Sequence, residues 1–357
     1  MAIRVAAYTR YAALGASSRV RWLQFLPELR RLGFDINVTP LLDDEYLCRK
    51  YDGRSTLGAI ARAYTRRAIA VLPRRHAADV VWIEKELWPW APAWLERFAW
   101  GRRPVMLDFD DAVFHSYDLH RSPAARALFG DKIDQLMRAA TLVVVGNDYL
   151  ARRARQAGAQ RVEVLPTVVD LKRYVVATRE TVTDAPLRVG WIGSPATVDY
   201  VRQLAGPLAA LAAKRRVVLR LIGAKVNLPN VPIEFVPWTE SGEVQAIADL
   251  DVGVMPLPDS PWERGKCGYK LVQYLACGVP VVASPVGVNA TLVQPGENGF
   301  LATTDAEWIQ ALTCLADDEA LRRRLGAQGR ALVESRYSLQ VAAPILAAWL
   351  NELGGMR

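Results

Sequence analysis

The sequence predicts an α/β protein made of two doubly wound domains with a cleft between them. Short apolar runs alternate with amphipathic helical segments along the chain, which is the pattern of βα units around a parallel sheet. The chain has 357 residues, more than one hydrophobic core usually supports. A polar, threonine-rich segment at 175–186 ends in proline, as a linker would. We therefore expect Rossmann-like domains at residues 1–174 and 187–338.

In the first half, the apolar runs predict the strands of one parallel sheet. A helix is predicted at 20–32, and Gly33 after it is a suitable helix stop. The runs are apolar throughout, so we expect the sheet to be buried on both faces. The predicted strands are 3–8, 34–40, 80–83, 105–109 and 142–145.

The second half repeats this pattern. Ligands of doubly wound sheets bind at the carboxyl ends of strands, so the loops after Gly193, Gly223 and Val236 are expected to line the cleft. A last helix at 339–353 is expected to pack back toward the first domain. The predicted strands are 187–193, 217–222, 233–236, 252–255 and 279–283.

The bulk composition favours an anionic partner. The net charge is +8 and the isoelectric point is near 9.4, which suits nucleic acid, nucleotide phosphates or anionic lipid. No nucleic-acid recognition motif is present, and no G-x-G-x-x-G follows either first strand, which argues against a dinucleotide enzyme. The four cysteines form no CxxC pair, and the first apolar run is too short for a signal peptide. These features predict a cytoplasmic protein.

The stretch 265–284 is the most informative part of the chain. It predicts a helix that stops at Gly278 and leads into a buried strand. Lys266 and Lys270 are four residues apart, so on a helix they share one face. Lysine is unfavourable at the positive end of a helix unless an anion is nearby. We therefore predict a diphosphate site, with a pair of solvated lysines as the alternative.

A second phosphate-binding element is predicted in the loop 193–197. It follows a buried strand at Gly193 and precedes a helix, so its backbone N–H groups can face a phosphate. Ser194 and Thr197 can add hydroxyl groups. Ordinary helix capping is the alternative role for both side chains.

Several of these motifs together resemble a known family. From Arg188 to Tyr337 the chain is similar to the C-terminal half of family 4 glycosyltransferases, which have the GT-B fold. The N-terminal half matches more loosely, through 146–150 and 164–170. The motifs that carry the resemblance are Gly190-Trp-Ile-Gly193, Asp249-Leu-Asp-Val-Gly-Val-Met-Pro256, the segment 274–284, Gly296-Glu-Asn-Gly-Phe300 and Tyr337-Ser338.

The resemblance implies a retaining glycosyltransferase of polysaccharide biosynthesis that works without metal or another cofactor. It would move a hexose-type sugar from a nucleoside-diphosphate sugar to a hydroxyl of a glycan or lipid-linked glycan. The family holds its donor with two glutamates eight residues apart. Here the second position is Gln273, which is expected to contact the ribose, and the first is Gly265, so Glu263 is the candidate substitute. The base is expected near Gly223 and Trp238.

In the N-terminal half, the resemblance points to a glycine-bearing loop after the first strand. This loop contains Gly15 and Arg19, and the arginine is a candidate phosphate contact or an ordinary solvated residue. At the tip of another predicted strand, Glu84 is expected to line the acceptor cleft, with an exposed salt bridge as the alternative.

The densest acidic cluster lies at 108–111. Asp108-Phe-Asp110 spells the D-x-D with which a different glycosyltransferase fold holds a metal ion, but three residues are a weak match. We expect Asp110 or Asp111 to orient the acceptor hydroxyl, with His115 as a partner. Capping of the following helix is the alternative.

Basic residues beside aromatic ones predict peripheral contact with an anionic membrane, at the inner face of the cell membrane. An amphipathic helix at 57–72 is expected to carry Arg62, Arg66 and Arg67 away from its apolar face, and Arg74 and Arg75 follow. An ordinary core-packed helix is the alternative. The aromatic and basic residues nearby are Trp88, Trp90, Trp94, Phe98, Trp100, Arg102 and Arg103.

Other functions remain open on the same scaffold. One is a nucleotide-sugar epimerase or hydrolase. Another is a catalytically silent, glycosyltransferase-like partner subunit, which the glycine at the first glutamate position leaves possible. A silent subunit need not bind any nucleoside diphosphate, so binding of these ligands separates the two cases.

Overall fold

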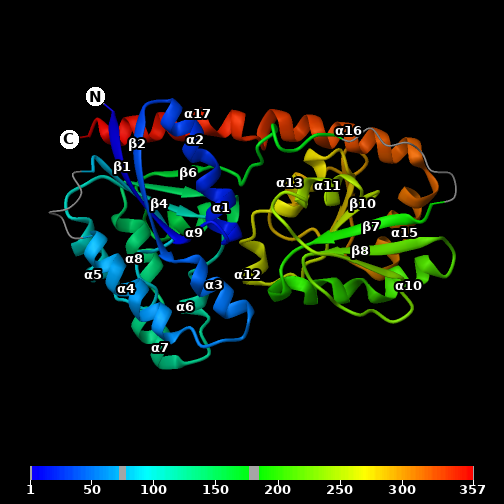
Figure 1. The fold of residues 1–357 in the computed structure, drawn as a ribbon, viewed down its shortest axis with the longest axis horizontal. Helices are drawn as coiled ribbons and strands as arrows, with labels where there is room; N and C mark the ends of the chain where they lie inside the picture. The colour runs from blue at the N-terminus through cyan, green and yellow to red at the C-terminus, as the bar shows by residue number, and fades with distance from the viewer. Residues whose placement is uncertain (1, 72–77, 177–184, 357) are drawn as a thin grey trace. The chain divides into compact units, whose positions relative to one another are not determined.

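The computed structural model describes residues 2–71, 78–176 and 185–356. These residues form two compact units, each with one six-stranded sheet and covering helices (Figure 1). The predicted fold class is confirmed. Arg74 and Arg75, the end of the helix predicted at 57–72, and most of the predicted linker lie outside the described residues.

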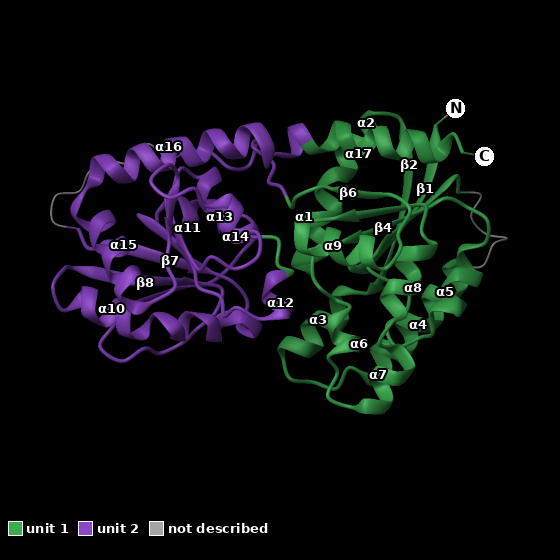
Figure 2. Cartoon of the chain, turned by 180° about the vertical axis from the view of Figure 1, so that it is seen from behind, with its two compact units in different colours: residues 1–167, 265–267, 342–357 green, residues 168–264, 268–341 purple. Residues whose placement is uncertain are grey.

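The first unit comprises residues 1–167, 265–267 and 342–357, coloured green in Figure 2. Its sheet has the order β2-β1-β3-β4-β5-β6, and all neighbouring strands are parallel. Every residue of β3, β4 and β5 is buried, as the apolar runs predict. The strands are β1 (Ile3–Tyr11), β2 (Phe34–Leu42), β3 (Val80–Glu84), β4 (Val105–Phe109), β5 (Leu142–Val145) and β6 (Val162–Val164).

The helix predicted at 20–32 is broken into short pieces. Trp22 leaves the helical conformation, and its ring stacks on Trp82 with 3.8 Å between the ring centroids. Pro27 then opens the next helix, a position that proline favours. The helices of this unit are α1 (Ala16–Arg21), η1 (Leu23–Phe25), α2 (Leu26–Arg31), α3 (Asp44–Tyr51), α4 (Leu57–Val71), α5 (Ala93–Trp100), α6 (His115–Asp118), α7 (Pro123–Phe129), α8 (Lys132–Ala139) and α9 (Asp148–Gln156).

Helix α4 packs against the core with Ile60, Tyr64 and Val71, and it also buries Arg67. Ala59, Ala63, Arg67 and Val71 form its buried stripe, whereas Leu57 is exposed. The prediction that Arg67 lies outside was wrong. Its guanidinium donates to the carbonyls of Thr9 and Thr39 in β1 and β2, and burial lowers the pKa of Arg67 to about 9. Carbonyl oxygens of β1 and β2 therefore satisfy the buried guanidinium of Arg67.

The second unit comprises residues 168–264 and 268–341. Its parallel sheet has the order β12-β11-β10-β7-β8-β9. The strands are β7 (Leu187–Ile192), β8 (Val217–Ile222), β9 (Ile233–Val236), β10 (Val252–Met255), β11 (Val281–Ala283) and β12 (Gly299–Leu301). The helices are η2 (Pro195–Leu204), α10 (Ala205–Ala212), α11 (Glu243–Ala248), α12 (Pro261–Arg264), α13 (Tyr269–Ala276), α14 (Asn289–Leu292), α15 (Asp305–Asp317), α16 (Glu319–Arg336) and the start of α17 (Leu339–Gly354).

Two glycines of the sequence motifs allow side chains to pack on this sheet. A Cβ on Gly253 of β10 would lie 2.4 Å from the ring of Tyr274. A Cβ on Gly190 of β7 would lie 2.2 Å from Leu250. The Tyr274 hydroxyl also accepts from the backbone N–H of Ile192, at 2.9 Å. The motifs thus bring α13 close to the end of β7.

The last helix contributes to the first unit from Ala342 onward. A Cβ on Gly354 would lie 2.8 Å from Ile3, so the end of α17 lies against β1, where Figure 1 marks both chain termini. Among the helices within the described ranges, none is both long and apolar enough to cross a bilayer.

Candidate active site

The candidate donor site lies at the carboxyl ends of the strands of the second unit. Strand β7 pairs with β8 on one side and with β10 on the other, so the winding of the sheet reverses at β7. Ligands of doubly wound sheets bind at such a reversal, outside the carboxyl ends. Residue 193 follows β7 directly.

The ring of Trp191 connects two predicted donor residues. A Cβ on Gly193 would lie 2.4 Å from this ring, so only glycine fits the turn. The ammonium of Lys270, in the first turn of α13, lies 5.4 Å from the centroid of the same ring. Trp191 is buried and places a cation beside the glycine loop. The sequence did not single it out, because a tryptophan in a strand is most often core.

Gly223 and Trp238 come together at the ends of the neighbouring strands. Gly223 has φ of 88°, a conformation that favours glycine. A Cβ there would lie 2.7 Å from the carbonyl oxygen of Gly193 and 3.1 Å from Trp238 Cβ. The structure therefore brings three predicted donor residues into one group.

The helix predicted after Gly193 is the 3₁₀ helix η2. Ser194 is the N-cap residue of η2, yet its side chain makes no capping bond to the described backbone. Thr197 donates its hydroxyl to the carbonyl of Ser194, at 3.2 Å. Capping thus does not explain the Ser194 hydroxyl.

The structure corrects the predicted position of Lys266. Helix α13 begins at Tyr269, after Gly268, whose φ of 65° is left-handed. A Cβ on Gly268 would lie 2.8 Å from Val288, which leaves no room for another residue type. Lys270 is in the helix, but Lys266 precedes it. The two lysines do not share a helix face.

Gln273 belongs to a buried chain of polar groups. Its Nε2 donates to the hydroxyl of Tyr174 at 2.8 Å, and this hydroxyl donates to Glu243 at 2.8 Å. The other oxygen of Glu243 accepts from the indole N–H of Trp238, at 2.7 Å. Burial raises the pKa of Tyr174 well above its usual value. The chain joins Gln273 to Trp238 through two residues, Tyr174 and Glu243, that the sequence did not indicate.

Glu263 is held beside the loop that follows β7. It lies in α12 and is buried, and its Oε1 accepts from the hydroxyl of Tyr200 in η2, at 2.6 Å. Ser260 donates to its other oxygen. Glu263 therefore lies near η2, on the donor side of the second unit.

Position 265 has no space for a side chain. A Cβ on Gly265 would lie 2.4 Å from Ala112 Cβ and 2.8 Å from Ala112 N. A glutamate at this position would require the backbone to move. The packing of the first unit around Ala112 thus requires a glycine at the first glutamate position.

Residues 265–267 are anchored within the first unit. Asn147 Nδ2 donates to the carbonyls of Gly265 and Lys266, at 2.9 and 3.1 Å. Cys267 Sγ donates to the carbonyl of Asp110 at 2.8 Å, and a Cβ on Gly146 would lie 2.1 Å from this sulfur. Sequence reasoning missed Asn147 as a positioning residue, although it lies in a motif shared with the family.

In the first unit, Glu84 ties together the loop that contains Gly15. It is buried, and its Oε2 accepts from the backbone N–H of Arg10 at 2.7 Å and from Ser18 at 2.6 Å. Its Oε1 lies 3.0 Å from the hydroxyl oxygen of Ser17. Glu84 is therefore not the exposed residue that a surface salt bridge would require.

Gly15 and Arg19 lie on either side of the start of α1. A Cβ on Gly15 would lie 2.2 Å from Tyr11 Cβ, so the turn after β1 needs a glycine. Arg19 donates to the carbonyl of Ala13, at 3.2 Å. Both predicted residues belong to the loop that Glu84 holds.

Asp110 lies in a buried ion pair. Its Oδ1 is 2.8 Å from Lys85 Nζ, and its Oδ2 accepts from Ser17 at 2.7 Å. Burial works to raise the pKa of Asp110, but Lys85 and Ser17 outweigh it, so the pKa lies below its usual value. Asp111 is 3.8 Å from the same ammonium. Asp110 is ionised and fixed, and Lys85 was missed because its sequence context resembles an exposed turn.

Asp108 and Asp110 have separate cationic partners. Asp108 Oδ1 accepts from Arg21 Nε at 2.8 Å, and both side chains are buried. Burial raises the pKa of Asp108 to about 6, against the pull of the guanidinium. Within the described part of the chain, no group of three histidine, cysteine or acidic residues has the geometry to hold a metal ion.

His115 is not brought to Asp110. Its Nδ1 lies 2.8 Å from Asp118 Oδ1, and its Nε2 lies 2.8 Å from the hydroxyl of Tyr149. Both ring nitrogens are therefore already bonded. The expected partnership with Asp110 or Asp111 is absent among these described contacts.

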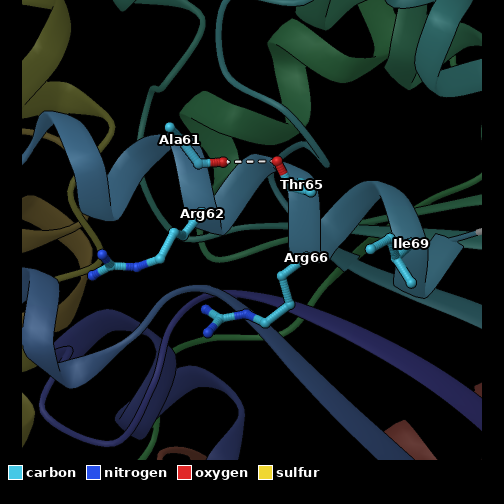
Figure 3. A pocket seen from close by; sticks show the side chains of 5 residues that line it. All are labelled: Ala61, Arg62, Thr65, Arg66 and Ile69. Atoms are coloured by element: carbon cyan, nitrogen blue, oxygen red, sulfur yellow. Dashed lines mark hydrogen bonds between the residues drawn. The ribbon is translucent and has the colours of Figure 1, made fainter.

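A surface hollow of about 480 Å³ lies on α4, away from these residues (Figure 3). Ala61, Thr65 and Ile69 line it together with two arginines. Arg62 pairs with Glu45, and Arg66 pairs with Asp43, so both guanidinium groups are committed to α3 and its cap. This hollow is not a candidate catalytic site.

Comparison with known proteins gives one family match and many similar folds. Residues 186–318 match the family described as glycosyl transferases group 1. No curated protein sequence matches the chain significantly. Sucrose-phosphate synthase from Thermosynechococcus elongatus superposes with a TM-score of 0.72 at 15% identity, over 99% of this chain and 100% of that one.

Two further solved structures have the same fold. HepE from Anabaena, in complex with UDP-glucose, has a TM-score of 0.71 at 18% identity, over 98% of this chain and 100% of that one. The lipopolysaccharide outer core galactosyltransferase WaaB, in its apo form, has a TM-score of 0.64 at 13% identity, over 97% and 99%. Residues 186–318 therefore match the glycosyl transferases group 1 family, and with the shared fold this supports a GT-B glycosyltransferase.

Proposed function

We propose that the chain is a retaining, family 4 glycosyltransferase that uses a nucleoside-diphosphate hexose as donor. In this proposal the second unit binds the donor and the first unit binds the acceptor. The observation that carries it is the packing of Lys270 and Gly193 on the ring of Trp191, at the carboxyl end of β7. A fixed cation beside a glycine loop at this edge suits a diphosphate.

The proposed chemistry is stabilisation of the leaving group. Negative charge grows on the β-phosphate as its bond to the anomeric carbon breaks. Lys270 and the backbone N–H groups after Gly193 meet this charge, so the reaction needs no metal ion. The acceptor hydroxyl oxygen bonds to the anomeric carbon from the face that the phosphate leaves, its proton passes to the departing β-phosphate oxygen, and the configuration is retained. Such a step requires no protein nucleophile.

The proposed contacts to the nucleoside use the buried polar chain. Gln273 gives its Nε2 to Tyr174, which leaves the amide oxygen to accept from a ribose hydroxyl. The base lies by Gly223 and Trp238, and Glu263 contacts the sugar. The UDP-glucose bound to HepE supports uracil as the first base to test.

The proposed acceptor is a hydroxyl of a glycan or lipid-linked glycan, in cytoplasmic polysaccharide biosynthesis. The lipopolysaccharide acceptor implied by the name of WaaB supports this class. Asp110 or Asp111 orients the acceptor hydroxyl, at the ends of strands of the first unit. Because Lys85 keeps Asp110 ionised, this carboxylate can accept a hydrogen bond from the hydroxyl.

A thermal-shift screen across UDP, GDP, ADP and their hexose derivatives tests this function. A ligand that binds the folded state raises its apparent stability. We expect one nucleoside diphosphate and its sugar to raise the melting temperature, and the same sugar nucleotide to be consumed when an acceptor glycan is added. A chain that responds to none of them is not a glycosyltransferase of this kind.

One observation favours a second candidate, a catalytically silent partner subunit. The space for the family's first glutamate is filled by Ala112, and Glu263 is bonded to Tyr200 and Ser260. Isothermal titration separates the candidates. A silent subunit shows no heat with any nucleoside diphosphate, or binds one without turnover in the presence of acceptor.

A further inference from the structure

The outward face of α5 carries large aromatic side chains. Trp94 and Phe98 are 66% and 82% exposed, and their spacing of four residues places them on one face of the helix. Exposed apolar residues usually occur singly, so two aromatic side chains in one stripe indicate a contact surface. The sequence pattern alone also pointed to Trp88 and Trp100, but both are buried.

The orientation of α5 is fixed by its opposite face. Glu96 is buried, and its carboxylate accepts from the backbone N–H of Leu87 at 2.7 Å. It also lies 2.9 Å from the ammonium of Lys132 in α8. Rotating the helix to cover Trp94 would expose this ion pair and leave its bonds unmade. The aromatic stripe is therefore held outward.

A third exposed ring adjoins this stripe in the chain. Trp90 is 45% exposed, and its φ of 61° is left-handed, which is rare for a bulky residue. The backbone N–H of Trp90 donates to the hydroxyl of Tyr117 at 3.2 Å. Its ring packs edge-on against Phe129 at the end of α7, with 5.8 Å between the ring centroids. Strained conformations of this kind persist where the surrounding structure fixes them. Contacts with Tyr117 and Phe129 thus fix Trp90 just before α5 begins.

The exposed charges next to this stripe have one sign. Residues 88–104 are described without a gap, and their exposed charged side chains are Arg97 and Arg102. Glu96, their one carboxylate, is buried. Exposed aromatic rings beside exposed arginines complement an anionic apolar boundary.

We propose that the outward face of α5, with Trp90 beside it in the chain, docks on an anionic lipid bilayer. This aromatic–arginine face is defined by Trp90, Trp94, Phe98, Arg97 and Arg102. The indole and phenyl rings enter the headgroup boundary, and the arginines contact lipid phosphates. The proposed function supplies only the biological reason for docking, which is access to a lipid-linked acceptor; the docking itself is argued from the exposed residues.

Co-sedimentation with vesicles tests the docking. We expect the protein to bind vesicles of phosphatidylcholine that contain a quarter of phosphatidylglycerol, and to bind pure phosphatidylcholine much less. Raising the salt from about 0.1 M to about 1 M should weaken binding, because it screens exposed charges. Equal binding to both vesicle types, or none to either, would overturn the proposal.

Paired variants test the face itself. W94A/F98A should lower the partition coefficient on anionic vesicles at least about tenfold. The control L57A/I69A removes exposed apolar side chains from α4 of the same unit and should leave it unchanged. All four residues are exposed, so we expect the variants to fold, and a melting curve checks this. If the control loses as much binding as W94A/F98A, this face is not the docking surface.

A charge-matched pair tests the arginines. R97Q/R102Q should weaken binding about 25-fold, because each cation near an anionic surface contributes about fivefold. R31Q/R54Q removes the same charge from exposed positions elsewhere and should change binding little. Equal losses in both pairs would mean that net charge, not this face, drives binding. The assay contains no nucleotide sugar, so its failure leaves the proposed transfer reaction untouched.

Discussion

The side-chain amide of Asn147 donates to the carbonyl oxygen of Gly265, at 2.9 Å. The same Nδ2 reaches the carbonyl of Lys266 at 3.1 Å, and Oδ1 accepts from Leu150 N at the start of α9. One buried side chain therefore caps a helix and fixes the segment just before α13. Lys266 takes its backbone position from this contact.

Removing the amide of Asn147 should destabilise the protein. N147A leaves one buried carbonyl, one partly buried carbonyl and one N–H without this partner, which should cost about 1–3 kcal/mol of the free energy of unfolding. Urea denaturation measures this cost. N37A, at an exposed position in β2, is the control and should lie near zero. An N147A variant as stable as N37A would show that the anchor contributes nothing.

A side chain at position 265 should be rejected by the packing. G265A places a Cβ 2.4 Å from Ala112 Cβ and should cost about 1–3 kcal/mol in unfolding free energy. A112G/G265A should recover only part of the loss, because the backbone N of residue 112 also lies 2.8 Å away. Denaturation of both variants checks this, after correction for A112G alone. A fully stable G265A would mean that the segment shifts freely and that a glutamate would fit here.

Lys270 should contribute more to nucleotide affinity than another cation of the same unit. K270A removes a charge held over Trp191 and should weaken binding of the nucleoside diphosphate about tenfold or more. K214A removes an exposed lysine that precedes the amino end of β8, opposite the carboxyl ends, and should leave affinity near the wild-type value. Isothermal titration of both variants decides the matter. Equal affinities would remove Lys270 from the proposed site.

The buried Asp108 should make stability depend on pH. Its pKa is raised to about 6 from 3.8, so the folded state holds the proton more tightly than the unfolded state. The stabilisation is therefore fully present below about pH 4 and is lost as the pH rises through about 6. D108N keeps an oxygen for Arg21 but does not titrate. From pH 4 to pH 7, wild type should lose up to about 3 kcal/mol relative to D108N.

Chemical denaturation at several pH values measures this difference. D199N, at a highly exposed carboxylate, is the control and should track the wild type across the same range. If the difference in unfolding free energy between wild type and D108N stays constant with pH, Asp108 does not change its proton affinity on folding.

The local pattern of the sequence determined the fold class. Apolar runs at Val105–Phe109 and Leu142–Val145 became fully buried strands, because a run without polar residues suits a sheet covered on both faces. The motif glycines also indicated close packing. Gly193 and Gly253 have no room for a Cβ, so these positions require glycine.

The tertiary structure alone decided which residues of each element face inward and which partners they find. Arg67 is buried because carbonyls of β1 and β2 accept its hydrogen bonds. The helical periodicity of the sequence does not predict these bonds. Lys266 lies outside α13 because Gly268 fits against Val288, and Asn147 holds residues more than a hundred positions away. Such contacts join distant segments, so their energies depend on the folded arrangement and not on the neighbouring sequence.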